Sequence, residues 1–141
     1  MNTIKTFCLL LVIFFSHTIC AQGIIGKWRT IDDETGEPKS IVKIYERSGK
    51  LFGDIIEILN SERVNSVCSK CEGDLKDQPI LGMTIIRDMK KGNGIYEKGS
   101  IVNPSTGKTY NCRLKLEDNT KLQVRGYVAF FYKTQYWERV N

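Results

Sequence analysis

Hydrophobic and polar residues alternate in short runs between residues 26 and 140, and turn-forming residues separate the runs. In the clearest run, Tyr110, Cys112, Leu114 and Leu116 share one face of an extended strand, and the residues between them are polar. This period of two predicts β-strands with one buried and one wet face. Eight strands are expected, over residues 26–30, 40–47, 50–59, 83–89, 94–102, 109–116, 121–130 and 134–140.

Short turns such as Ser48-Gly49 and Thr106-Gly107 separate most of these strands, which makes consecutive strands antiparallel neighbours. In the seventh, Leu122, Val124, Gly126, Val128 and Phe130 share a face. About eight such strands remove their exposed edges best by closing, so the pattern predicts an all-β fold, a single antiparallel up-and-down β-barrel. The longer stretch from Asn60 to Leu81 is expected to form a structured excursion over one barrel end.

The segment Met1–Ala21 has the features of a secretory signal peptide. Lys5 gives it a positive start, an apolar run follows from Cys8 to Phe15, and the small residue Ala21 precedes the expected cleavage point. The apolar run is too short to cross a bilayer, so we expect a secreted or periplasmic protein with no membrane span. Cleavage leaves residues 22–141, a length that suits one domain with its own core.

Charge and histidine content narrow the function classes. The chain has 21 Lys and Arg against 16 Asp and Glu, but its basic residues are spread out rather than clustered. A nucleic-acid surface normally needs clustering, so no nucleic-acid partner is expected. The only histidine, His17, lies in the signal peptide, and the mature chain thus lacks the commonest general base. An enzyme is the least favoured class, and we expect no cofactor.

Three cysteines remain after the signal peptide: Cys68, Cys71 and Cys112. An oxidising compartment favours one disulfide, and Cys68–Cys71 is the first candidate because the βαβ setting of a redox dithiol is missing. Cys112 lies on the apolar face of its strand and is expected to be a buried free thiol. Without a histidine the cysteines lack a fourth zinc ligand, and Asp32-Asp33-Glu34 lacks the spacing of a hard-cation loop, so no metal site is predicted.

Planar donors and aromatic rings gather on the last two expected strands, at Arg125, Tyr127, Thr134, Gln135 and Trp137. We predict that the first four of these orient a ligand. A structural interpretation stays open, in which Arg125 and Gln135 hydrogen-bond across the sheet and Trp137 packs in the core. Arg125 and Tyr127 lie opposite the apolar face of their strand and would reach an interior ligand only if that interior is partly polar.

Gly26-Lys27-Trp28 at the first strand and Trp137-Glu138-Arg139 at the last resemble the calycin, or lipocalin-like, arrangement. The resemblance implies that Trp28 packs beneath the basic side chain of Arg139 and closes one barrel end, with Trp137 also structural.

Further motifs resemble the secreted domain of unknown function family 2147 across essentially the whole mature chain. They are Cys68-Ser69-Lys70-Cys71-Glu72-Gly73, Pro79-Ile80-Leu81-Gly82-Met83, Gly99-Ser100-Ile101-Val102-Asn103-Pro104, Gly107-Lys108-Thr109-Tyr110, Val124-Arg125-Gly126-Tyr127 and Thr134-Gln135-x-Trp137-x-Arg139. This resemblance implies a lipocalin-like barrel and, by the name of the family, no established activity. Asn103 stands where the family usually has Asp, and Lys133 where it usually has Arg, so a role for a carboxylate or guanidinium does not carry over there.

The predicted function is a non-enzymatic barrel that binds a small, partly apolar ligand, since a closed eight-stranded barrel can hold one such molecule. The alternative is an envelope structural or protein-interaction module with a packed interior, whose partner is another envelope protein. A wide apolar cavity favours the binder, and filled interior layers favour the module.

Overall fold

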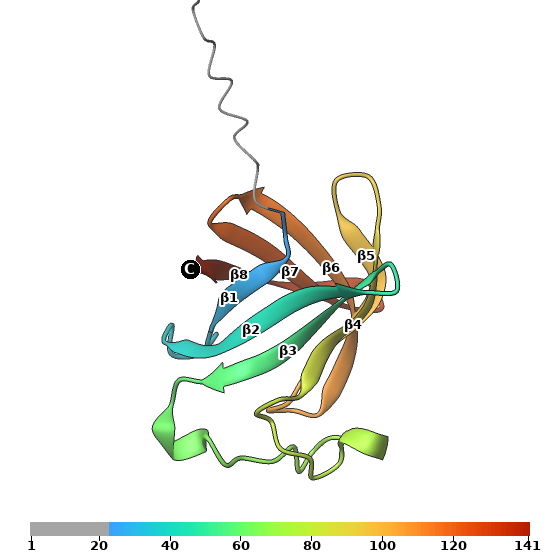
Figure 1. Ribbon diagram of the computed structural model, residues 1–141. Coiled ribbons are helices and arrows are strands. Elements are labelled where there is room, and N and C mark those ends of the chain that lie inside the picture. Colours follow the sequence, from blue (N-terminus) through green and yellow to red (C-terminus); the bar gives the residue numbers. More distant parts are fainter. Residues whose placement is uncertain (1–22) are drawn as a thin grey trace, which may run out of the picture.

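The computed structural model describes residues 23–141, which form eight antiparallel strands closed into one barrel (Figure 1). Each strand pairs with the next in the chain, and the first closes on the last. The strands are β1 Gly26–Ile31, β2 Pro38–Arg47, β3 Lys50–Ile58, β4 Thr84–Lys91, β5 Tyr96–Asn103, β6 Lys108–Asp118, β7 Lys121–Val128 and β8 Phe131–Val140. The predicted fold class is therefore confirmed. The predicted signal peptide, Met1–Ala21, lies outside the described residues.

The last hairpin differs from the prediction. β7 ends at Val128 rather than at residue 130, and β8 begins at Phe131 rather than at residue 134. Ala129 adopts a positive φ of 50°, which closes a tight turn and pairs Val128 directly with Phe131. The prediction that Val128 and Phe130 lie on a buried face was wrong, because the hairpin extends beyond the barrel and leaves both side chains exposed.

The interior is filled by large side chains from every part of the barrel. Those with almost no exposed surface include Trp28, Val42, Ile44, Ile86, Met89, Leu114, Leu122 and Trp137. Glycines lie where the large side chains come close to the backbone. A Cβ on Gly99 would lie 2.5 Å from the Met89 sulfur, and one on Gly53 would lie 3.1 Å from Ile86. The barrel interior is therefore a close-packed core.

One barrel end is closed around Trp28, and we call it the Trp28 end. The guanidinium carbon of Arg139 lies 4.3 Å from the centre of the Trp28 ring, and the indole N–H donates to the Ile24 carbonyl at 2.8 Å. Arg139 also donates to the carbonyls of Gly23 and Asn119, at 2.6 Å each. The last strand thus ties the start of the described chain and the β6–β7 turn over the tryptophan.

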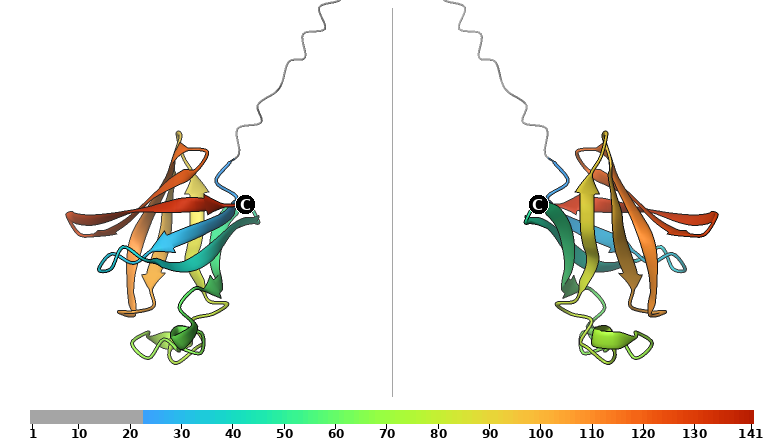
Figure 2. Two further views of the ribbon diagram at one scale, coloured as in Figure 1. Left: turned by 90° about the vertical axis from the view of Figure 1, so that its left-hand side faces the viewer. Right: turned by 90° about the vertical axis from the view of Figure 1, so that its right-hand side faces the viewer.

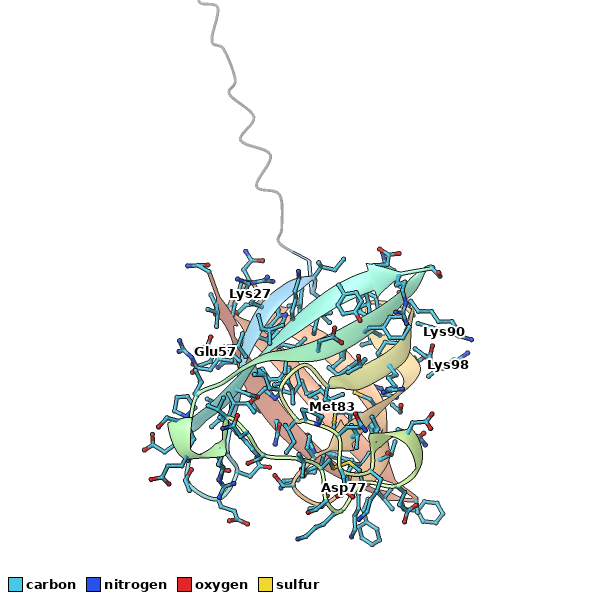
Figure 3. All side chains as sticks on the ribbon, turned by 60° about the horizontal axis from the view of Figure 1, so that its bottom comes forward. Lys27, Glu57, Asp77, Met83, Lys90 and Lys98 are labelled. Atoms are coloured by element: carbon cyan, nitrogen blue, oxygen red, sulfur yellow. A yellow bond between two sulfur atoms is a disulfide. The ribbon has the colours of Figure 1, made fainter. Side chains whose placement is uncertain are left out.

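The other end carries residues 59–83, which we call the excursion segment, and we call this end the excursion end. Figure 2 shows the segment below the barrel in both views, and Figure 3 looks onto it, with Asp77 and Met83 labelled. It contains two 3₁₀ turns, Ser61–Arg63 and Gly73–Leu75, and a bridge between Val67 and Pro79. No helix within residues 23–141 is long and apolar enough to span a bilayer.

Candidate functional site

Strand register divides the four predicted ligand-binding residues between the two faces of the barrel wall. Residues directly opposite each other in an antiparallel pair point to the same side. Gln135 pairs with Val124, which is buried in the core, so Gln135 points inward. Arg125 pairs with Thr134, and Tyr127 pairs with Tyr132, on the outward face. The four residues therefore do not converge on one site.

The outward residues form a cluster of rings and cations on β6, β7 and β8. Arg125 Nε donates to Thr134 Oγ1 at 3.0 Å, and the Arg125 guanidinium carbon lies 4.7 Å from the centre of the Tyr132 ring. The rings of Tyr127 and Tyr132 are 5.6 Å apart. Arg113 lies over Tyr127, with 5.4 Å from its guanidinium carbon to the ring centre. These contacts fix the outward side chains against one another on the surface of the barrel.

Gln135 belongs to a chain of polar contacts that runs from the buried Trp137 to the surface at the excursion end. The buried Trp137 indole N–H donates to Gln135 Oε1 at 2.9 Å, and Gln135 Nε2 donates to Asp33 Oδ2 at 2.7 Å. Lys133 Nζ lies 2.8 Å from the same Asp33 oxygen, and this hydrogen bond raises the pKa of Lys133. The sequence did not single out Asp33 as a partner of these residues, because it lies 102 positions before Gln135.

The neighbouring acidic residues shape a turn. Backbone N–H groups of Thr35 and Glu34 donate to Asp32 Oδ1 at 3.0 and 2.9 Å, and these hydrogen bonds lower the pKa of Asp32. Within residues 23–141, no three His, Cys, Asp or Glu side chains lie close enough together to hold a metal ion.

A half-open cleft of about 510 Å³ lies at the excursion end, between the excursion segment, the β5–β6 hairpin and the end of β7. Its lining is Cys71, Glu72, Leu75, Val102, Gly107, Lys108, Thr109, Tyr110 and Val128. Apolar surface comes from Leu75, Val102 and Val128, while Lys108 and Glu72 supply opposite charges. The volume lies within the range of small-molecule sites, and the lining offers both apolar surface and polar groups to a ligand.

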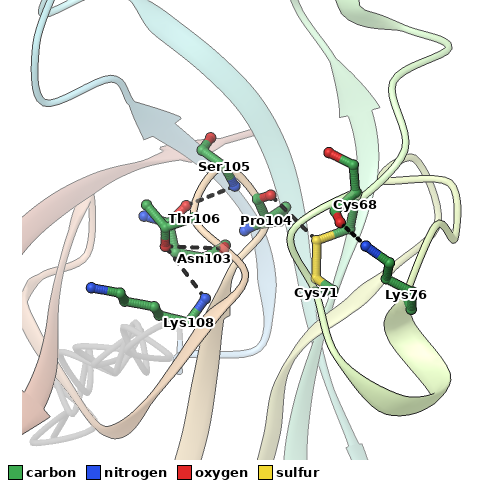
Figure 4. The surroundings of a disulfide bond; sticks show 9 residues. Cys68, Cys71, Lys76, Asn103, Pro104, Ser105, Thr106 and Lys108 are labelled. Carbon is green, nitrogen blue, oxygen red and sulfur yellow. Dashed lines mark hydrogen bonds between the residues drawn. A yellow bond between two sulfur atoms is a disulfide. The ribbon is translucent and has the colours of Figure 1, made fainter.

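A disulfide lies beside this cleft, and one of its two residues, Cys71, belongs to the lining. Cys68 and Cys71 are bonded to each other, both are buried, and Cys68 Sγ lies 3.3 Å from the Pro104 carbonyl in the β5–β6 loop (Figure 4). Lys76 Nζ donates to the Ser69 carbonyl within the same segment. Cys112 is a buried free thiol, and burial raises its pKa to about 12.

Two loops meet backbone to backbone at Gly107. A Cβ at Gly107 would lie 1.9 Å from the Lys70 carbonyl oxygen, and its φ is +72°, so both the space and the conformation require glycine. Asn103 Oδ1 accepts from the Ser105 N–H at 3.0 Å. Because a carboxylate oxygen could accept the same bond, Asn103 retains the turn-forming role open to the usual aspartate.

The comparisons with known proteins agree with this architecture. The model of the family described as "Uncharacterized protein conserved in bacteria (DUF2147)" matches residues 26–139, from the start of β1 almost to the end of β8. No curated protein matches the chain. Among solved structures, the chain is similar to protein HP1028 from the human pathogen Helicobacter pylori, which is described as belonging to the lipocalin family.

The two structures superpose with a TM-score of 0.74 at 22% sequence identity, and the alignment covers 84% of each chain. At this identity the likeness shows the fold alone. The match to the family model spans all eight strands, including the Trp28 end and the loops that line the cleft. The chain therefore belongs to the DUF2147 family, and its fold is a lipocalin-like barrel.

Proposed function

We propose that this barrel binds one small amphipathic molecule in the cleft at the excursion end, and that it carries out no chemistry on it. The observation that carries the proposal is the half-open cleft of about 510 Å³, which combines apolar walls with a lysine and a glutamate. The lipocalin-like fold is consistent with small-ligand binding. The ligand would be held at the end of the barrel, because packed side chains fill the interior.

The proposed ligand has an apolar body and a polar or charged head group. Val102 and Val128 reach the cleft from β5 and β7, and Leu75 reaches it from the excursion segment. The Lys108 ammonium at the start of β6 favours an anionic head group, since a charge-assisted hydrogen bond is stronger than a neutral one. Gln135, Asp33 and Lys133 are paired with one another and with Trp137, so we assign them a structural role.

The probe 8-anilinonaphthalene-1-sulfonate tests the cleft directly, because it is a small aromatic molecule with an anionic group. We expect Lys108→Glu to weaken its affinity at least about tenfold, which corresponds to about 1.4 kcal/mol. Lys115→Glu is the matched control, since Lys115 is an exposed lysine on the same strand but outside the cleft lining. Equal affinities for the wild type and both variants would contradict the assignment.

The filled interior favours a second candidate function, a structural or protein-interaction module in the cell envelope. Trp28, Met89 and Leu122 are among the side chains that leave no room for a ligand within the barrel layers. Such a module would bind no small molecule at the cleft. It would instead be recovered with a protein partner after crosslinking in the host, and Lys108→Glu would leave that capture unchanged.

A further inference from the structure

The tip of the β7–β8 hairpin is an exposed apolar surface of which the cleft proposal uses only Val128. Phe130 is 99% exposed and Phe131 is 80% exposed, and Val128 and Tyr132 beside them are 53% and 58% exposed. Figure 2 shows this dark red hairpin reaching sideways beyond the other loops of the barrel. Large exposed apolar surfaces on soluble domains mark sites of contact with proteins or membranes.

The residues of the hairpin change character in order from its tip to the barrel. Val128 pairs with Phe131 next to the tip, and the following pair is Tyr127 with Tyr132. After it come two pairs that carry cations, Gly126 with Lys133 and Arg125 with Thr134. From the tip inward, the order is apolar side chains, then tyrosines, then cations. A bilayer has matching layers in the same order from its centre outward: hydrocarbon, interface and charged head groups.

The spacing of these pairs fits the same layers. A strand rises about 3.3 Å per residue, so Arg125 lies roughly 10 Å from the Val128 pair along the hairpin. Amphipathic helices that lie in the membrane interface bury their apolar faces about 5–10 Å deep, and we take the same depth for the hairpin tip. With the two phenylalanines at that depth, the tyrosine hydroxyls reach the interface and Arg125 reaches the phosphates.

The charges near the tip favour an anionic surface. Lys133 is paired with Asp33, and Arg113 lies 3.7 Å from Glu97, but Arg125 has no carboxylate within ion-pair distance among residues 23–141. Its described partners are the Thr134 hydroxyl, the Tyr132 ring and Tyr127, so no carboxylate neutralises its charge. A second copy of the chain is disfavoured as occupant, because pairing two tips would bring like charges together.

From the order, spacing and charge of these residues, we infer that the β7–β8 tip inserts into the interface of a membrane with anionic phospholipids. Phe130 and Phe131 enter the acyl boundary, Tyr127 and Tyr132 lie at the interface, and Arg125 binds a lipid phosphate. Val128 also lines the cleft, so docking through the tip would place the cleft beside the bilayer surface. This inference stands on the hairpin alone and does not require that the cleft bind a ligand.

Vesicle sedimentation tests the inference on residues 23–141, which contain every strand of the closed barrel. We expect binding to vesicles of phosphatidylethanolamine and phosphatidylglycerol, and weaker binding to phosphatidylcholine vesicles. The double variant Phe130→Ser with Phe131→Ser should lower the partition coefficient at least about tenfold while thermal unfolding stays unchanged, because both side chains are exposed. Arg125→Gln should weaken binding to the anionic vesicles only.

Two further measurements make the test specific to the tip. Ile56→Ser removes an exposed apolar side chain from β3, across the barrel, and should leave vesicle binding unchanged. In Phe131→Trp, the new indole should shift its emission to the blue and be quenched by brominated lipids. The native Trp28 and Trp137 are buried and should not respond.

Failure to bind anionic vesicles would overturn the inference, and so would binding that survives the double tip variant. Tip-dependent capture of a protein, or tip-dependent dimerisation, without vesicle binding would assign the hairpin to a protein partner instead and equally overturn it. Loss of dye binding at the cleft would leave the vesicle result untouched, so the two proposals fail separately.

Discussion

Trp28 and Gln135 both point into the barrel, but they differ in what the sequence reveals about them. The resemblance of Gly26-Lys27-Trp28 and Arg139 to the calycin arrangement implied that Arg139 covers Trp28, and the Arg139 guanidinium carbon lies 4.3 Å from the centre of the Trp28 ring. The inward orientation of Gln135 follows from its pairing with Val124, and its partner Asp33 comes from a loop that barrel closure brings near. Such distant polar contacts depend on register, which residue types alone do not fix.

Replacing Trp28 by alanine is expected to destabilise the protein by roughly 3 to 5 kcal/mol, the usual range for removing a large buried aromatic side chain. Chemical denaturation measures the loss. Phe130→Ala is the control, because this exposed ring should contribute within about 0.5 kcal/mol. A loss below about 1 kcal/mol for Trp28→Ala would mean that this barrel end is not closed as described.

Replacing Gln135 by alanine should cost about 1 to 3 kcal/mol, because the buried Trp137 N–H loses its acceptor. Gln123→Ala is the matched control: Gln123 is also a β-strand glutamine, but it hydrogen-bonds the exposed Glu117 on the outer face. We expect the control to stay within about 0.5 kcal/mol in the same denaturation experiment. Equal losses of unfolding free energy for the two variants would show that the hydrogen bond from Trp137 to Gln135 does not stabilise the fold more than a surface hydrogen bond does.

The Cys112 thiol should resist iodoacetamide in the folded protein at about pH 8, because burial raises its pKa to about 12 and little thiolate forms. The raised pKa of Cys112 also makes the free energy of unfolding depend on pH. Its contribution is complete below the ordinary thiol pKa of 9.0 and is lost as the pH rises toward the folded value. The difference in unfolding free energy between wild type and Cys112→Ala should therefore change in that alkaline window, and rapid alkylation of the folded protein would contradict the burial.

Among the elements, the strands were predictable because alternation and short turns fix them locally. The β7–β8 hairpin was misplaced because its turn, Ala129-Phe130, has none of the usual turn residues, and an apolar run suggested a longer buried strand. The excursion segment was expected over a barrel end. The segment packs on the β5–β6 loop through a backbone contact between Gly107 and Lys70, and this contact shapes the cleft. The pattern of residues in the sequence does not predict such a contact.

That contact gives a prediction for the excursion segment. Gly107→Ala should destabilise the protein by about 1 to 3 kcal/mol more than Gly36→Ala, because its Cβ would overlap the Lys70 carbonyl. Gly36 is a matched control, since it has the same φ of +72° but open space around its Cβ position. Thermal or chemical unfolding of the two variants gives the difference, and equal stabilities would show that the segment is not seated on the loop.

At the scale of the whole molecule, the packed core and the two proposed binding surfaces lie in different parts of the barrel. The Trp28 end and the interior are packed, whereas the excursion end combines the cleft with the exposed hairpin tip. This division follows from the connections: the excursion segment, the β5–β6 loop and the β7–β8 turn all lie at that end. Closure of eight strands was predictable from the sequence, but which end stays open depends on packing between segments far apart in the chain.

Native mass spectrometry of the protein purified from its own host tests most directly whether the barrel carries a small molecule. We predict one bound molecule per chain on the wild type and on Lys115→Glu, and its loss from Lys108→Glu, which alters the cleft. The bare chain mass for the wild type, or a bound molecule that Lys108→Glu retains unchanged, would contradict ligand binding in this cleft.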